Sequence, residues 1–303
     1  MMRFRLECAY RGTFFRGWAK QPGLRTVQGT LEEALALVLR EPVELTVAGR
    51  TDAGVHASAQ TAHFDVCADR LMQVTKQAEV VHACEALTRR LNRLIRRADS
   101  NASGLPDVVV YSIEPVADVF DARFAALRRH YVYRVADVAG RNPLYAESVW
   151  WVEEPLQIHL MREAARALVG EHDFLSFCKP REGASTIRTL EAVDLVETDT
   201  GLEVRLSADA FCHSMVRSIV GALVEVGRGR KPVTWIADLV AFPSREQAAP
   251  LAPPHGLTLR AVDYPPAEQW AAQQQKTRRL RSVADFSEGG LVDLAADSGC
   301  CGE

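Results

Sequence analysis

The chain has 303 residues, of which 48% are hydrophobic and 25% charged, and its formal net charge is −3. These values are typical of a globular protein with one large domain or two ordinary ones, and no apolar run approaches the length of a membrane span. The seven scattered cysteines contain no C-x-x-C pair, which indicates neither a zinc site nor a disulfide framework. The N-terminus lacks the apolar core of a signal peptide, so we expect a protein of the reducing cytoplasm.

The first half of the chain predicts the element order β-α-β-β-α-β. Alternating apolar residues from Phe4 to Tyr10 predict a half-buried strand. Thr26 or Thr30 can cap the helix that follows, and Thr30 with Glu33 fits a capping box. The remaining predicted elements are strands at 43–48, 62–66 and 108–113 and a helix at 82–97. This order is that of the split βαβ, or ferredoxin-like, arrangement.

The second half repeats this order loosely. Strands are predicted at 128–136, 186–196, 202–206 and 257–262, and helices at 159–169, 211–226 and 234–240. We therefore expect an α+β fold of two ferredoxin-like halves whose sheets lie side by side and leave a central cleft. The expected divisions are an N-terminal domain at 1–114, a connector at 115–124, a C-terminal domain at 125–266 and a disordered tail at 267–303.

The motif GRTDAGVHA occupies residues 49–57, directly after a predicted strand. Arg50 and Asp52 would share a side of an extended segment, and Gly49 and Gly54 permit a tight backbone around them. Arg50, or another arginine brought in by the fold, could keep Asp52 ionised in a pocket, where an ionised aspartate can act as a nucleophile. The competing interpretation is that Asp52 caps a turn or a helix and Arg50 pairs with a surface acid.

Charge is distributed unevenly along the chain. Arginines cluster at 89–97 and again at 123–134, whereas acids concentrate at 191–203 and in the last residues. Net charge of −3 argues against indiscriminate nucleic-acid binding but permits a local basic cleft. The alternative is that the arginines belong to ordinary solvated helix and strand faces.

Several blocks of the sequence resemble the bacterial tRNA pseudouridine synthase A family in the same order. They are AYRGTFFRGWAKQP at 9–22, TVQGTLEEAL at 26–35, GRTDAGVHA at 49–57, FDARFAALRRHYVYRV at 120–135, RNPLYA at 141–146, DFLSFC at 173–178, AFCHSMVRSIVGALVEVGRG at 210–229 and APPHGLTLRAVDYP at 252–265. An ordered set of blocks over about residues 3 to 265 is far more specific than one short motif.

The resemblance implies a role for five residues. Asp52 resembles the aspartate on which the reaction depends, and Arg50 the arginine that helps displace the target nucleotide. Tyr131 resembles the tyrosine that packs on the uracil and takes part in proton removal. Arg217 resembles the arginine that forms a salt bridge with the catalytic aspartate, and Leu257 the apolar wall below the base. From the residues alone, Tyr131 and Leu257 could equally be core residues, whereas Arg217 interrupts an apolar helix and needs a buried partner.

The resemblance further implies isomerisation of uridine to pseudouridine at positions 38 to 40 of tRNA, in the anticodon stem-loop. The expected partners are tRNA and a second copy of the chain, as a homodimer, with no metal, cofactor or membrane. Arg16, Lys20 and Arg25 are candidate phosphate contacts, together with Arg11 and the arginines at 89–97. Lys20 stands where an arginine is usual in the family, which preserves charge but not bidentate geometry.

Two other functions compete with this interpretation. A catalytically silent RNA-binding protein could share the fold, although it would not need Asp52, Arg50, Tyr131 and Arg217 together. A glycoside hydrolase with an aspartate nucleophile would need a second carboxylate close to Asp52. The nearest acids in sequence, Glu44 and Asp65, lie on the flanking strands.

Deletion of residues 270–303 is expected to leave activity intact.

Overall fold

The computed structural model describes residues 1–98, 105–180, 185–247 and 249–278. Its first half contains β1 (Met2–Tyr10), α1 (Val27–Leu39), β2 (Thr46–Val47), β3 (His56–Val66), α2 (Ala68–Thr75), α3 (Val80–Ala98) and β4 (Val108–Val116). Strand β1 pairs antiparallel with both β3 and β4, and β2 pairs antiparallel with β3. The resulting order, β4-β1-β3-β2, is the one expected for a ferredoxin-like unit.

The second half repeats this topology. It contains β5 (Arg128–Ala136), β6 (Trp150–Trp151), α4 (Ile158–Ala165), β7 (Gly170–Asp173), β8 (Ile187–Thr198), β9 (Gly201–Ala208), α5 (Met215–Gly227), α6 (Thr234–Ala241), β10 (Leu257–Asp263) and α7 (Trp270–Arg278). Strand β5 lies between β10 and β9, and β8 follows β9, with every pair antiparallel. The expected α+β fold with two such halves is therefore confirmed.

The two halves join through one short parallel contact. Strand β3 is long enough to pair with β2 near its middle and with β10 at its beginning, through Thr258–His56 and Leu259–Ala57. Within the described residues, the ten strands thus form a single sheet. The division into domains at 115–124 stays a prediction, since the sheet runs from one half to the other without a break.

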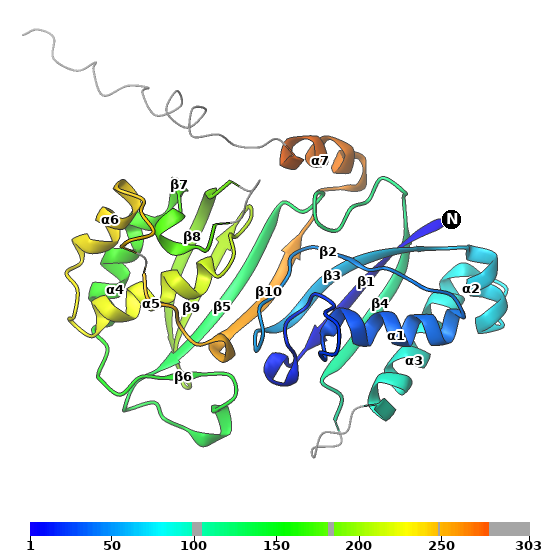
Figure 1. Ribbon diagram of the computed structural model, residues 1–303, viewed down its shortest axis with the longest axis horizontal. Helices are drawn as coiled ribbons and strands as arrows, with labels where there is room; N and C mark the ends of the chain where they lie inside the picture. The colour runs from blue at the N-terminus through cyan, green and yellow to red at the C-terminus, as the bar shows by residue number, and fades with distance from the viewer. Residues whose placement is uncertain (99–104, 181–184, 248, 279–303) are drawn as a thin grey trace, which may run out of the picture.

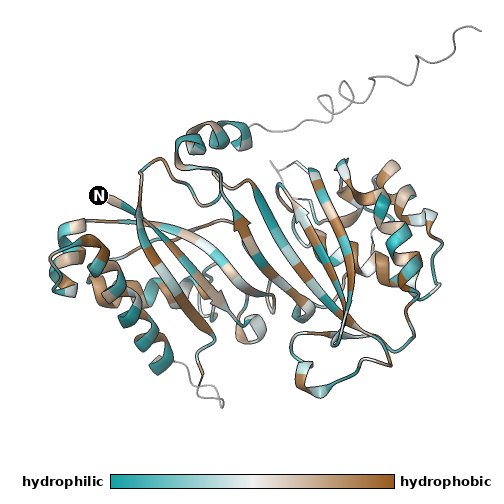
Figure 2. Ribbon diagram, turned by 180° about the vertical axis from the view of Figure 1, so that it is seen from behind, coloured by the Kyte–Doolittle hydropathy of each residue, from teal (hydrophilic) through white to brown (hydrophobic). Residues whose placement is uncertain are grey.

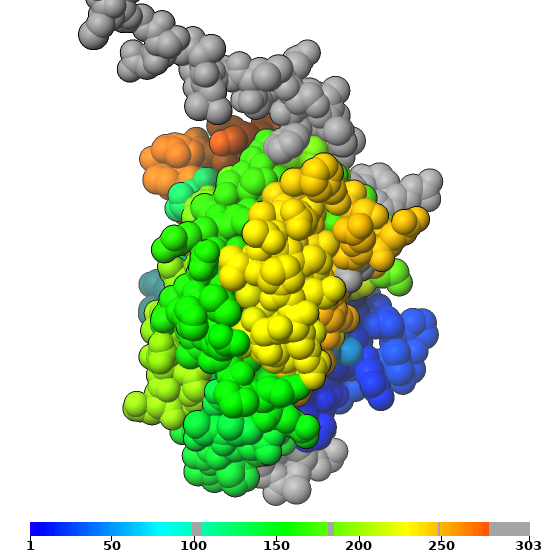
Figure 3. All heavy atoms as spheres, turned by 90° about the vertical axis from the view of Figure 1, so that its left-hand side faces the viewer, coloured from blue at the N-terminus to red at the C-terminus, as the bar shows by residue number. Residues whose placement is uncertain are grey.

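A helical cluster packs on each half of the sheet, and β5 and β10 lie between the two clusters (Figure 1). Seen from the side of the second half, α5 and α6 in yellow lie on the same side of the molecule as the N-terminal residues in blue (Figure 3). Figure 2 shows the molecule from behind the view of Figure 1, and there hydrophobic and hydrophilic residues alternate along the strands. No helix in the described ranges combines the length and apolar character needed to cross a membrane.

Three local expectations were wrong. Thr26, not Thr30, caps α1, because its hydroxyl accepts the Gly29 N–H at 3.2 Å, so the proposed capping box does not form. Only Thr46 and Val47 of the strand expected at 43–48 pair with β3. The helix α2 and the strand β7 were not foreseen. Residues 99–104, between α3 and β4, lie outside the described part of the chain.

The sequence-based prediction placed the start of the disordered tail too early, at residue 267. Residues 267–278 form a 3₁₀ turn and the helix α7, in which Trp270 is only 8% exposed. A single large aromatic side chain supplies the apolar contact that the helix otherwise lacks. Residues 279–303 lie outside the described part of the chain.

Candidate active site

The loop between β2 and β3, residues 48–55, holds Asp52 by backbone bonds to the N-terminal segment. The Trp18 N–H donates to the Thr51 carbonyl at 3.1 Å, and the Gly54 N–H donates to the Phe15 carbonyl at 3.3 Å. The φ angle of Gly54 is +80°, a conformation that favours glycine, whereas Gly49 has open space around it and no positive φ. Only the second glycine of the motif is therefore required by the backbone.

A buried hydroxyl network fixes the same loop from below. The hydroxyls of Tyr10 and Thr51 lie 2.8 Å apart, and the Gln60 amide donates to the Tyr10 oxygen and to the Gly49 carbonyl. Buried polar groups that satisfy one another in this way hold one conformation, because any other would leave donors unpaired. Asp52 is thus presented on a rigid support.

The carboxylate of Asp52 meets three side chains from the beginning of α5. The Ser214 hydroxyl donates to Oδ2 at 3.0 Å, and the Arg217 guanidinium lies 3.3 Å from the same oxygen. His213 Nε2 lies 3.3 Å from Oδ1. Asp52 belongs to the first half of the chain and its partners to the second, so the site forms only where the halves meet. The interpretation of Asp52 as a structural cap is not supported, since among the described residues its carboxylate contacts these three side chains and accepts no backbone N–H.

Arg217 is the buried cation that the apolar helix α5 required. Its side chain is 13% exposed, and Nε donates to the Ala252 carbonyl at 2.8 Å while the other end reaches Asp52. Ser214 precedes α5 with a left-handed φ of 64° and uses its hydroxyl for Asp52 instead of capping its own helix. The N-terminal end of α5 therefore lies at the Asp52 carboxylate.

An aromatic and aliphatic wall stands next to this carboxylate. Tyr131 is buried on β5, and its ring meets Phe211 edge-on with centroids 5.1 Å apart. Burial raises the pKa of the Tyr131 hydroxyl to about 12, and the nearby charge of Asp52 adds to the effect. Leu257, at the start of β10, lines the same cleft and pairs with Tyr133 across the strands. The surroundings suit a flat uncharged ring.

Asp52 lies in a cleft of about 970 Å³ that runs between the two helical clusters. Nine arginine and lysine residues line it, compared with four acidic residues. A concave surface with this excess of positive charge attracts phosphates, although the chain as a whole is slightly acidic. A smaller hollow of about 460 Å³ adjoins Asp52 on the side of Arg16 and Pro254.

The basic residues expected to contact RNA are only partly brought together. Arg50 lines both hollows and Arg16 the smaller one, and both side chains are exposed. Lys20 instead forms an ion pair with Glu32 at 3.2 Å, and Arg25 forms one with Asp107 at 2.9 Å. Neither Lys20 nor Arg25 lines the cleft. The arginines at 89–97 lie on α3, also away from it, whereas those at 123–129 line it.

Sequence comparisons agree with this geometry. A family model described as tRNA pseudouridine synthase matches residues 164–265. The chain is 46% identical to the tRNA pseudouridine synthase A of Leifsonia xyli subsp. xyli over 289 residues, which cover 93% of this chain and 98% of that protein. It is 43% identical to the one from Corynebacterium glutamicum over 300 residues, covering 96% and 99%.

The chain belongs to the tRNA pseudouridine synthase A family. The similarity to the protein of that name from Streptomyces avermitilis, 45% over 288 residues, likewise covers 93% of this chain and 95% of the relative. The matched family model includes α5 and β10, which carry Arg217 and Leu257, but not β5, which carries Tyr131.

In this member of the tRNA pseudouridine synthase A family, three residues of the site were missed from the sequence. His213 and Ser214 stand in the block AFCHSMVRSIVG, and their position before an arginine-bearing apolar helix was the available signal. Arg129 is buried, and its guanidinium donates to the carbonyls of Ala48, Arg123 and Asp209. It ties the Asp52 loop to the second half, and nothing in its sequence context distinguished it from neighbouring arginines.

Proposed function

We propose that this protein isomerises uridine to pseudouridine in tRNA, with Asp52 as the group on which the reaction depends. The observation that carries the proposal is the Asp52 carboxylate held by Ser214 and Arg217 in a basic cleft, beside the Tyr131 ring. Family membership supplies the reaction, and the geometry supplies a means of performing it. A carboxylate with two donors on one oxygen and free space beside it suits an attacking group.

The reaction breaks the N1–C1′ bond, turns the base and forms a bond between C5 and the same sugar carbon. Asp52 can attack the uracil ring, attack the sugar carbon or assist a glycal route, and these stay open. In each, the detached uracil must stay in place, which is the role proposed for Tyr131, Phe211 and Leu257. No redox change is needed, so the proposed mechanism uses no cofactor.

The last step removes the proton from C5. At neutral pH the Tyr131 hydroxyl holds its own proton, because its pKa is raised to about 12. Tyr131 is proposed to pack on the uracil and to take part in proton removal, a step in which its own proton must first pass to another group. Arg50, exposed at the mouth of the cleft, is suited to support a nucleotide turned out of its stack.

The target proposed from the family resemblance is the anticodon stem-loop, at positions 38 to 40. Recognition through phosphates and RNA shape fits a cleft lined by arginine and lysine. A homodimer that binds one tRNA across both subunits is proposed on the same resemblance. Light scattering of the purified protein tests the dimer, and a monomer at micromolar concentration would exclude it.

The proposed function is tested with unmodified tRNA labelled with tritium at C5 of uridine. Formation of pseudouridine releases that tritium to water, and sequencing of the product locates the modified positions. Release at positions 38 to 40 is expected. Tight binding of tRNA without release would favour the catalytically silent RNA-binding protein, and release from other positions would correct the target alone.

A further inference from the structure

The helix α7 is anchored to the connector between the halves by a small core of its own. Trp270 packs on Phe120 with ring centroids 4.8 Å apart, and Phe120 packs on Tyr264 at 5.1 Å. The Trp270 indole N–H donates to the Pro265 carbonyl at 2.9 Å. This cluster is separate from the main core, and within it Trp270 holds α7 against the connector.

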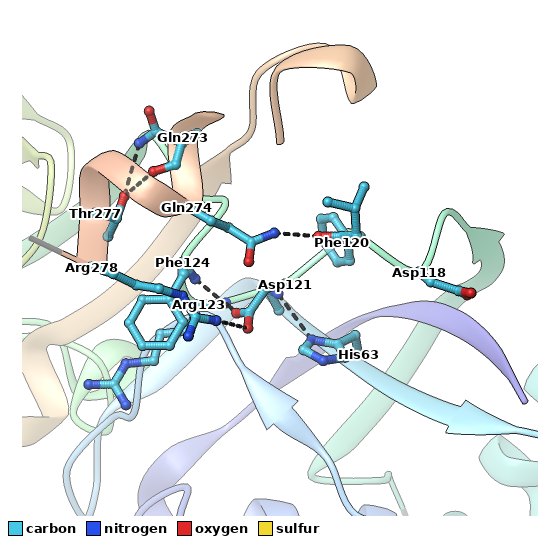
Figure 4. A network of polar contacts seen from close by, with 12 residues as sticks. His63, Asp118, Phe120, Asp121, Arg123, Phe124, Gln273, Gln274, Thr277 and Arg278 are labelled. Carbon is cyan, nitrogen blue, oxygen red and sulfur yellow. Dashed lines mark hydrogen bonds and ion pairs between the residues drawn. The ribbon is translucent and has the colours of Figure 1, made fainter. Parts of the chain in front are cut away.

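Polar contacts then fix the rotation of the helix. The Gln273 amide donates to the Ala126 carbonyl at 3.2 Å, and the Gln274 amide donates to the Val119 carbonyl. Arg278 lies 3.4 Å from Asp121 and stacks over the Phe124 ring at 4.2 Å (Figure 4). With these side chains turned to the connector, Lys276 is left exposed and lines the basic cleft.

Lys276 has no ion-pair partner among the described residues, unlike Arg278 and Arg128, which are paired with acids. Arg123 lines the same end of the cleft and is also exposed. An exposed lysine with no ion-pair partner among the described residues, on an anchored helix that lines a basic cleft, is suited to a phosphate.

The strand β10 measures how far this end of the cleft lies from Asp52. Leu257, at the start of β10, lines the cleft together with Asp52. At the other end of β10 the Asp263 carbonyl accepts the Leu127 N–H, next to Ala126, whose carbonyl accepts the Gln273 amide of α7. Six residue steps at about 3.3 Å each give about 20 Å. A backbone phosphate about 20 Å from the target nucleotide would therefore lie at this end of the cleft.

We infer that α7 is one wall of the RNA-binding cleft and that Lys276 binds a backbone phosphate of the tRNA, about 20 Å from the target uridine. This inference rests on the proposed function. It gives the C-terminal segment a role in substrate binding, so deletion of residues 270–303 is expected to weaken tRNA binding, contrary to the expectation from sequence.

The test compares Lys276→Glu with Lys231→Glu, which makes the same charge change at a lysine that packs over Trp235 and does not line the cleft. Two RNAs are used: full-length unmodified tRNA, and a hairpin whose stem ends about four base pairs from the target. Affinities are measured as a function of salt, and turnover is measured at saturating RNA.

For full-length tRNA, Lys276→Glu is expected to raise Kd about tenfold near 0.1 M salt and to reduce the salt slope by about one phosphate contact. Turnover at saturation should stay within about twofold, and Lys276→Arg should restore the affinity. For the short hairpin, all variants should match the wild type, as should Lys231→Glu with either RNA. An unchanged Kd and salt slope on tRNA would overturn the inference, as would an equal loss on the hairpin.

Failure of the proposed function is recognised separately. If the wild type binds tRNA but releases no tritium, the isomerase proposal fails while the affinity comparison remains readable. If the wild type is active and Lys276→Glu binds tRNA as the wild type does, the isomerase proposal survives and only the role of α7 is lost.

Discussion

The two halves of the molecule share one topology but differ in the connection between the second and third strands of the ferredoxin-like unit. In the first half, eight residues separate β2 from β3, and they carry Asp52. In the second half, two residues, Asp199 and Thr200, turn β8 directly into β9. The same fold thus has an acid at the corresponding place in each half, and only the longer connection folds back against the N-terminal segment and reaches a cleft.

The helix that precedes the last strand of each ferredoxin-like unit, α3 or α5, also differs between the halves in how far it is buried. The helix α3 buries one stripe and exposes its arginines, whereas α5 is buried on almost all sides. Only α5 therefore needs a buried partner for its arginine, and Asp52 of the other half is that partner. The comparison shows that the candidate site depends on one longer loop in the first half and one buried helix in the second, on the same ferredoxin-like framework.

Among the substitutions that test this comparison, removal of the buried arginine should have the largest effect on turnover. Arg217→Ala is expected to lower turnover about 100-fold, or ~2.7 kcal/mol, because Asp52 loses the cation that orients it. The matched change in the first half is Arg90→Ala on α3, which removes bonds to the Val74 and Thr75 carbonyls. Steady-state kinetics with tRNA should show unchanged turnover for that control, and a loss of the same size would contradict the account.

Removal of the hydroxyl at the start of α5 should have a smaller effect. Ser214→Ala deletes one hydrogen bond to a charged oxygen, worth about 1.5–3 kcal/mol, so turnover should fall at least about tenfold. Ser218→Ala, one turn further along the same helix, is the control and should keep turnover within about twofold. Equal activity of Ser214→Ala and the wild type would show that Arg217 alone positions Asp52.

Alkaline pH should lower the free energy of unfolding because both halves contain buried tyrosines. Burial raises the pKa of Tyr10 in the first half and of Tyr131 and Tyr133 in the second, so each stays protonated in the folded protein while the unfolded chain ionises near pH 10. Their stabilising contribution is full below pH 10 and is lost as pH rises, by about 1 kcal/mol for each tyrosine at pH 10.5. Urea unfolding between pH 8 and 11 measures this, and a constant free energy of unfolding would contradict it.

The smallest effect is expected for the acid in the short turn. Asp199→Asn should change the free energy of unfolding by less than about 0.5 kcal/mol and leave turnover unchanged, because Asp199 is exposed and outside the cleft. Thermal unfolding and the tritium assay check both parts. A clear loss of activity would mean that the second half contributes through its own turn as well.

Sequence patterns predicted the fold well wherever burial produced a period. The alternation in β1 and β5 and the apolar stripe of α1 led to the correct elements, because one face of each is buried. The sequence left Thr26 and Thr30 open as caps of α1, and the capping box expected for Thr30 with Glu33 does not form because Thr26 is the cap. The helix α7 was missed because its single anchor, Trp270, gives no periodic pattern.

Prediction of the site had a similar limit. The resemblance identified Asp52, Arg217 and Tyr131, and the structure brings these three to one cleft. Lys20 and Arg25 were expected to be available to phosphates, yet each is paired with an acid distant in sequence, Glu32 and Asp107 respectively. The clamp formed by Arg129 depends on three carbonyls from separate segments, which no local pattern reveals.

The most direct measurement concerns Asp52 itself, with tritium release and tRNA affinity determined on the same preparation of Asp52→Asn. The amide keeps the shape of the side chain but carries no negative charge. We predict no release above background and a Kd for tRNA within about tenfold of the wild type, a difference of at most ~1.4 kcal/mol. Release at a rate comparable to the wild type would contradict the central claim that this carboxylate performs the isomerisation.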